Sequence, residues 1–239
     1  MICLTFDTDH MSEPAMQEFL RLFPIPGKAT FFCHRRFLAL DGAVHEIAPH
    51  PFIENLSNWK PRLEALAASL PEKPYGTRTH SCVFSHMVGI ELHDMGYRYI
   101  SQASAMYQTG LRPFRHPWGV WELPIYYMDN MDFWMAKNWP EIGHKPFSSH
   151  VIQAALDNED ALFVFDMHPL HVALNTRGHE DYASVKKRIV IDGQSPFEVA
   201  FHGRGARAFF EELCEAMDRR GARSYSCVDA LAHFGCLNC

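Results

Sequence analysis

Residues 2–10 read ICLTFDTDH, an apolar run that ends in two aspartates and a histidine. Such a run predicts a buried strand, and Asp7 and Asp9 then point to the same side of the extended chain. Two carboxylates held this close repel each other unless a cation lies between them or one is protonated. A cap for a helix that begins near Ser12 would need one aspartate, not two. The pair therefore indicates a functional site where the first strand leaves the core.

The rest of the chain repeats this strand signal and alternates it with helical patterns. Further strand-like runs occur at 28–33, 44–48, 75–79, 97–101, 119–126, 161–167 and 222–227. Helical patterns occur at 13–22, 59–70, 85–95, 149–157 and 205–220. The alternation predicts an α/β fold with a mostly parallel sheet, open or closed into a barrel, in a single domain over residues 1–239. Two stretches, 102–147 and 172–204, fit neither pattern and are predicted to be active-site loops or insertions.

Composition limits the classes of function. The chain has 239 residues, of which 47% are apolar and 21% charged, and a formal net charge of −6, as expected for an ordinary globular protein. It has no basic run, which argues against a nucleic-acid partner, and no apolar stretch near the roughly 20 residues that span a bilayer. We see no secretion signal and expect the cysteines to be free thiols, so we expect a cytoplasmic protein. Cys236 and Cys239 form a CxxC that we expect in an exposed tail.

Further polar residues follow the later strand-like runs. HEIAPHPFIEN places His50 and Glu54 after the third run, GTRTHSCVFS places Arg78 and His80 after the fourth, and ALFVFDMHPLH places His168 after the seventh. In parallel α/β folds, ligands bind beyond the carboxyl ends of the strands, so these side chains are expected to meet. Aspartate and histidine together favour zinc or a similar divalent metal, and an open position for water would make the site hydrolytic.

Two of these residues have a distinct expected role. A partly buried arginine needs a carboxylate partner, and Asp7 is the obvious candidate for Arg78. His168 stands between a strand-like run and Pro169, where a histidine is well placed as a general acid or base.

The order of these motifs resembles the polysaccharide deacetylase family, the NodB-homology carbohydrate esterases. LTFDTD is similar to the family's TFDD motif, ATFF at 29–32 to its second-strand signature, and HEIAPH to HEIGNH, which opens its metal-binding motif. GVWELPI at 119–125 is similar to the ELP segment of some branches, and FDMHP to the last motif. The resemblance implies a distorted (β/α) barrel, similar to a TIM barrel, with about seven parallel strands.

The resemblance also implies roles for individual residues. Asp7 would be the general base and Arg78 the arginine that orients it. Asp9 and His50 would be metal ligands. His168 would be the general acid that protonates the leaving amine.

The third metal ligand departs from the family pattern. The family usually has a second histidine four residues after the first, and here that position is Glu54. We expect His80 to be the third ligand, with Glu54 as the alternative and His10 as a further candidate. The RxHS variant resembles an atypical branch of the family, the WbmS-like deacetylases of O-antigen loci.

The implied activity is removal of an N-acetyl group from a sugar or glycan precursor by a metal-dependent hydrolase, with zinc as the expected metal. Trp118, Trp121, Tyr126 and Tyr127 are candidates to stack on the sugar, and packing in the core or in loops is the alternative for each of them. Two other functions stay open: hydrolysis of a small or cyclic amide, and carbohydrate binding without catalysis.

Overall fold

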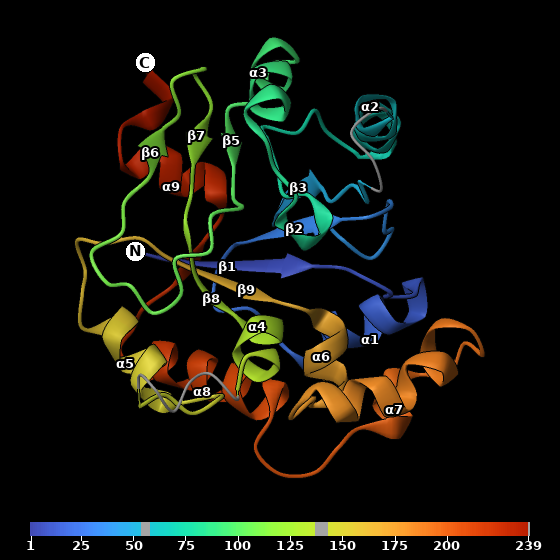
Figure 1. Ribbon diagram of the computed structural model, residues 1–239. Coiled ribbons are helices and arrows are strands. Elements are labelled where there is room, and N and C mark those ends of the chain that lie inside the picture. Colours follow the sequence, from blue (N-terminus) through green and yellow to red (C-terminus); the bar gives the residue numbers. More distant parts are fainter. Residues whose placement is uncertain (54–57, 137–142, 239) are drawn as a thin grey trace.

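The computed structural model describes residues 1–53, 58–136 and 143–238. Its strands are β1 (Ile2–Asp7), β2 (Ala29–Cys33), β3 (Glu46–Pro49), β4 (Gly76–Thr77), β5 (Tyr99–Ile100), β6 (Phe114–Arg115), β7 (Trp121–Glu122), β8 (Ile125–Met128), β9 (Phe163–Met167) and β10 (Ser224–Tyr225). Each of the eight strand-like runs of the sequence overlaps at least one of them. β1 and β9 lie at the centre of the fold (Figure 1).

Parallel strands pair in a closed order. β1 pairs with β2 and β9, β2 with β3, and β8 with β9, all in parallel. The backbone N–H of Arg78 donates to the carbonyl of Pro49 (3.4 Å), which joins β4 to β3. β4 pairs with β5, and β5 with β7, which leads through Leu123 and Pro124 into β8. The protein is thus an α/β barrel with short, irregular strands on one side, and the family resemblance implied such a distorted barrel.

Helices surround this barrel. They are α1 (Glu13–Leu22), α2 (Trp59–Ser69), α3 (His86–Asp94), α4 (Asp129–Trp134), α5 (Ser149–Leu156), α6 (Pro169–Leu174), α7 (His179–Val190), α8 (Ala206–Arg219) and α9 (Cys227–His233). α2 and α3 lie on one side of the central strands, and α5, α7 and α8 on the other (Figure 1). The hydroxyl of Ser12 caps α1 by accepting from the N–H of Ala15.

The two stretches that were predicted to be loops or insertions both contain helices, which corrects the prediction. Region 172–204 is not a plain loop, because it contains α7, and α4 lies within region 102–147. α7 carries charged residues over most of its length and buries Val185 and Ile189, so its apolar face is narrow. A narrow apolar face gives a weak periodic signal, which explains why the sequence analysis missed this helix.

The main core lies between β1, β2 and the helices α1 and α8. The ring of Phe6 stacks on Phe31 (4.8 Å between centroids) and meets the edges of Phe19 (5.5 Å) and Phe210 (5.7 Å). All four side chains are buried. Truncating one such ring to alanine typically costs about 3–5 kcal/mol. This packing fixes β1, and with it the position where Asp7 and Asp9 leave the core.

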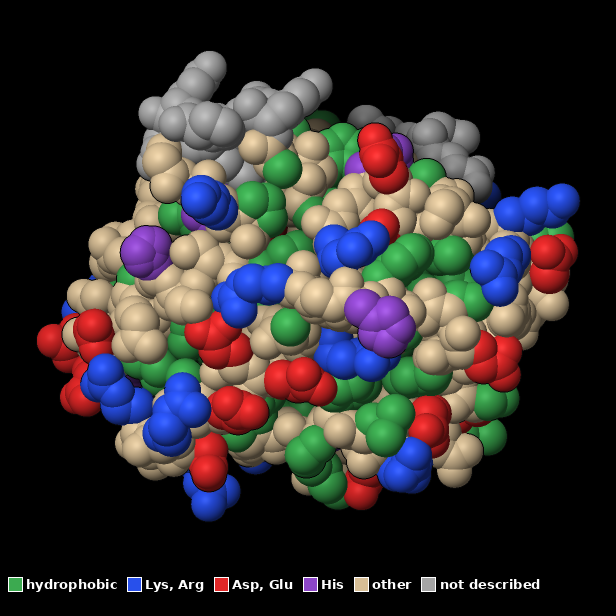
Figure 2. All heavy atoms as spheres, turned by 90° about the horizontal axis from the view of Figure 1, so that it is seen from below, with side chains coloured by type: hydrophobic (Ala, Val, Ile, Leu, Met, Phe, Trp, Pro, Cys, Tyr) green, Lys and Arg blue, Asp and Glu red, His purple; other side chains and the backbone are tan. Residues whose placement is uncertain are grey.

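The surface carries mixed charge. On the face shown in Figure 2, Lys and Arg side chains are interspersed with Asp and Glu. No helix among the described residues is long and apolar enough to cross a membrane. Cys236 is buried against the end of α9, which corrects the expectation of an exposed tail, while Cys239 lies outside the described residues.

Candidate active site

The functional candidates meet where the parallel strands end. Asp7 is the last residue of β1, and His50, Arg78 and His168 directly follow β3, β4 and β9. Asp9 lies in the turn after β1. All five are buried, although acidic and basic side chains rarely are. The barrel therefore converts short sequence motifs, far apart in the chain, into one polar cluster.

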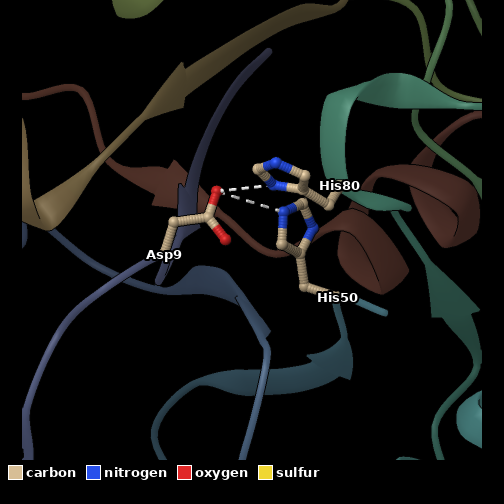
Figure 3. A group of neighbouring side chains, drawn as sticks. All are labelled: Asp9, His50 and His80. Carbon is tan, nitrogen blue, oxygen red and sulfur yellow. Dashed lines mark hydrogen bonds and ion pairs between the residues drawn. The ribbon is translucent and has the colours of Figure 1, made fainter. Parts of the chain in front are cut away.

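Asp9, His50 and His80 form a group that could hold a metal ion (Figure 3). One carboxylate oxygen of Asp9, Oδ2, faces both rings: it lies 3.0 Å from Nδ1 of His80 and 3.5 Å from Nε2 of His50. Burial alone would raise the pKa of Asp9, but the two histidines lower it well below its ordinary value. The carboxylate is therefore ionised and available as a ligand.

Two buried atoms in this group fit a metal. Nδ1 of His50 hydrogen-bonds to the carbonyl of Arg78 (2.8 Å), which in the neutral ring puts the proton on Nδ1 and leaves a lone pair on Nε2. That Nε2 and Oδ1 of Asp9 are both buried, and neither has a hydrogen-bond partner among the described residues. Unpartnered buried polar atoms are costly, and a cation between them would satisfy both. The donor set also suits zinc.

His80 approaches from a strained loop. Ser81 and Cys82, which follow it, have positive φ values of 59° and 51°. The ring of His80 stacks on Phe52 (4.2 Å between centroids), which fixes its orientation toward Asp9. Non-glycine residues with positive φ are uncommon and often mark functional sites. The alternative ligand, Glu54, lies outside the described residues.

Arg78 joins two carboxylates in the barrel interior. Its Nη1 donates to Oδ1 of Asp7 (2.9 Å) and Oδ1 of Asp166 (2.9 Å), and its Nε and Nη2 donate to Ser101. Burial disfavours the charge, but the two aspartates raise the pKa of Arg78 further above its ordinary value. The predicted pair of Arg78 with Asp7 is present. The second carboxylate partner of Arg78, Asp166, was not predicted. Burial raises the pKa of Asp166 above its ordinary value.

His168 has its own carboxylate. Asp129, at the start of α4, accepts from the backbone N–H of His168 (2.8 Å) and lies 2.7 Å from its Nδ1. Burial lowers the pKa of His168, but Asp129 outweighs it and raises the pKa to about 10. His171 also approaches Asp129, with its Nδ1 at 3.4 Å. Nε2 of His168 lies 3.8 Å from Oδ2 of Asp9, which places a charged imidazolium beside the Asp9 group.

A cavity of about 300 Å³ opens beside these groups. It is lined by Asp9, His10, His80, Ser81, Asn130, Phe133, Trp134, His168, Leu170, His171, Tyr182 and Lys186. Its size lies at the lower end of the range for small-molecule sites. Its aromatic walls come from α4 and α7, neither of which the sequence analysis predicted.

The four aromatic residues proposed to stack on a sugar do not line this cavity. Tyr126 is buried against Phe163, and its hydroxyl donates to the carbonyl of Val151, so its place in the core corrects that prediction. Tyr127 is likewise buried, with its ring stacked on a core phenylalanine. Trp118 stacks on His116 (4.6 Å) and lines a separate surface hollow, and Trp121 is half-buried in β7.

Asp129 is the main functional candidate that the sequence analysis did not single out. It sits in the segment YYMDNMDFW, which lacks a helical pattern of useful length. The available signal was a pair of aspartates, Asp129 and Asp132, three residues apart directly after an apolar run. Both are fully buried, and Asp132 lies 2.8 Å from the hydroxyl of Tyr127.

The protein is an α/β barrel that carries a candidate metal-binding group of aspartate and histidine where its parallel strands end. The family model of the WbmS-like polysaccharide deacetylases matches residues 4–186, which is most of the chain. The chain therefore belongs to the polysaccharide deacetylase family, as its motifs suggest. None of the curated proteins matches its sequence.

Several solved structures are similar to this chain. A candidate polysaccharide deacetylase involved in O-antigen biosynthesis, from Bordetella bronchiseptica, superposes with a TM-score of 0.70 at 20% identity, over 90% of this chain and 89% of the other. A pseudoenzyme of the CE4 family from Bacillus anthracis has a TM-score of 0.46 at 14% identity, over 97% and 65% of the two chains. A candidate polysaccharide deacetylase from Mycobacterium smegmatis has a TM-score of 0.45 at 15% identity, over 93% and 91%.

Proposed function

We propose that the protein is a metal-dependent hydrolase that removes the N-acetyl group of a sugar or glycan precursor. One observation carries the proposal: a candidate base and a candidate acid flank the Asp9–His50–His80 group. Oδ2 of Asp7 lies 3.7 Å from Nε2 of His50, and Nε2 of His168 lies 3.8 Å from Oδ2 of Asp9. Amide hydrolysis needs both roles, one to take a proton from water and one to give a proton to the amine.

Asp9, His50 and His80 would hold the metal, with zinc as the best match to one carboxylate and two imidazoles. When bound, a divalent metal supplies Lewis acidity, which polarises the amide carbonyl and makes water more acidic. His80 is the most exposed of the three side chains, at 35%, so the group opens toward the cavity on this side.

Asp7 is the proposed general base. Arg78 holds one oxygen of its carboxylate and leaves the other, Oδ2, facing His50. Oδ2 takes a proton from the water whose oxygen forms the new bond to the amide carbon. The fixed ion pair keeps the carboxylate oriented throughout, so little reorganisation is needed when the water attacks.

His168 is the proposed general acid. With its Nδ1 hydrogen-bonded to Asp129, its second proton sits on Nε2, which lies near Asp9. As the carbon–nitrogen bond breaks, Nε2 gives this proton to the nitrogen, which leaves as an amine while acetate forms. Since the pKa of His168 is raised to about 10, the ring carries the proton at neutral pH.

The substrate class rests on the family and on the B. bronchiseptica relative, a candidate deacetylase involved in O-antigen biosynthesis. We propose an N-acetylated sugar precursor in the cytoplasm. Free cysteines, among them the buried thiols of Cys3, Cys33 and Cys227, support a reducing compartment.

The test is acetate release from N-acetylated mono- and oligosaccharides by the zinc-loaded protein. We expect release that stops on chelation and returns when zinc is added back, and that is lost in Asp7→Asn. Release from small or cyclic amides without release from any sugar would contradict the sugar substrate and favour the amide hydrolase. Absence of release from both classes by protein that carries zinc would contradict the hydrolase.

A further inference from the structure

One wall of the cavity is formed by α7, which contributes two of its lining residues. Tyr182 and Lys186, four residues apart, lie on the same face of this helix, and both line the cavity. Tyr182 packs edge-on against His171 (5.3 Å between centroids), which ties this face of the helix to the site. The wall formed by α7 thus combines the aromatic ring of Tyr182 with the cation of Lys186.

Lys186 is an exposed residue that lies beside Tyr182. Its Nζ lies 5.4 Å from the centroid of the Tyr182 ring, within the range of a cation–π contact. His10 lines the same cavity. His10 has a positive φ of 58°, so a strained turn presents its ring to the same space.

The described residues that line the cavity include few charged side chains. Asp9 is the one acidic residue among the described residues that line the cavity, and it faces His50 and His80. Lys186 is the one lysine or arginine among the same described residues. No carboxylate of the described lining is therefore left to pair with Lys186, and an anion entering the cavity would meet a positive wall.

We propose that this cavity selects N-acetylated sugars that carry a negatively charged group, a carboxylate or a phosphate, and that Lys186 binds this group while the ring of Tyr182 packs on the sugar. The proposal rests on the proposed function, because the acetylated end of the sugar would lie at the Asp9 group. It adds the substrate class: an anionic amino sugar instead of a neutral one.

Binding of three ligands to the zinc-loaded Asp7→Asn protein, which is expected to release no acetate, tests the proposal by calorimetry. The ligands are the methyl glycoside of N-acetylglucosamine, N-acetylglucosaminuronic acid and N-acetylglucosamine 1-phosphate. Lys186→Met removes the cation, and Lys187→Met is the matched control, because Lys187 is an exposed lysine of the same helix that does not line the cavity. Methionine and lysine have similar helix propensities.

We expect at least one anionic ligand to bind about tenfold more tightly than the neutral one, and Lys186→Met to remove this preference while Lys187→Met keeps it. The two anionic ligands show whether the group is a carboxylate or a phosphate. Equal binding of all three ligands would overturn the proposal, and so would an anion preference that both variants keep, since the anion would then bind the metal alone. Because binding is measured without turnover, failure of acetate release is a separate result that concerns the proposed function.

Discussion

The described residues include two groups of one aspartate and two histidines, and the groups differ in which ligand atoms already have hydrogen-bond partners. In the group of Asp9, His50 and His80, Oδ1 of Asp9 and Nε2 of His50 are buried without a hydrogen-bond partner among the described residues. In the group of Asp129, His168 and His171, both oxygens of Asp129 accept hydrogen bonds from within the group. The first group has free ligand atoms, and the second is satisfied by its own protons.

Both groups have the same residue types, so only this difference distinguishes metal binding from proton transfer. Metal binding needs lone pairs that converge on an empty point, whereas a histidine held by a carboxylate is suited to carry a proton. We therefore assign metal binding to the first group and proton transfer to the second. Substitutions made in one group at a time can test this assignment.

The largest expected effect comes from removing a ligand. His50→Ala should lower the affinity for zinc by at least about 100-fold and abolish acetate release, because loss of a direct ligand costs more than loss of an outer partner. The measurement is zinc content after dialysis against a metal buffer. His171→Ala is the matched control, a buried histidine of the second group that should keep its zinc. Equal loss in both variants would end the distinction between the groups.

Removing the carboxylate of the second group should affect protons but not metal. Asp129→Asn should keep zinc and lower kcat by about 10²–10⁴, the usual range for a general acid or base. Asp129 raises the pKa of His168 to about 10, so in the wild type the acid stays protonated until the pH rises through that value. In the variant, the pKa falls, and the loss of kcat with rising pH should begin at lower pH. An unchanged pH profile would contradict the role of His168.

A substitution of Arg78 tests its ion pairs with Asp7, the proposed base, and with Asp166. Arg78→Ala leaves the carboxylates of Asp7 and Asp166 buried without their cation, and we expect a loss of about 3–5 kcal/mol in the free energy of unfolding. The measurement is denaturant unfolding of the metal-free protein. As control, Arg21→Ala removes an exposed ion pair with Glu18 and should leave the denaturation midpoint unchanged. Similar midpoints for the two variants would show that the network is not stabilising.

Proton competition at the ligands gives a smaller effect. Burial lowers the pKa of His50, but Asp7 and Asp9 together raise it above its ordinary value of 6.5 in the metal-free protein. Because zinc binds the neutral ring, the apparent zinc affinity should fall as the pH drops through the raised pKa, by about tenfold per pH unit for each proton bound. Zinc titrations between pH 5 and 8 measure this slope. A pH-independent affinity would remove His50 from the ligand set.

The smallest expected effect concerns an aromatic residue outside the cavity. Trp118 stacks on His116 in a separate surface hollow, so Trp118→Ala should change KM by no more than about twofold, as for an ordinary surface substitution. A larger increase in KM for a long glycan would restore Trp118 as a contact for distant sugar units.

The residues at strand ends were predictable because their position follows from the fold. Once alternation indicates parallel strands, Asp7, His50, Arg78 and His168 must lie at the same end of the barrel. The partners that orient them were not predictable in the same way. Asp129 and Asp166 act through hydrogen bonds that depend on the packing of α4 and β9, and this packing has no local sequence signal.

The aromatic residues show the same limit. Tyr126 and Tyr127 looked suited to sugars, but β8 is buried on both faces, so both rings enter the core. Trp134 and Tyr182 line the cavity from α4 and α7. These helices have short or narrow apolar faces, and nothing in their local sequence indicates that they cover the site.

The most direct test of the assignment is a crystal structure of the zinc-loaded protein with an anomalous difference map at the zinc edge. We predict one peak at about 2.0–2.2 Å from a carboxylate oxygen of Asp9, Nε2 of His50 and Nδ1 of His80. A peak bounded by Asp129, His168 and His171 instead, or no peak at either group at saturating zinc, would contradict the account.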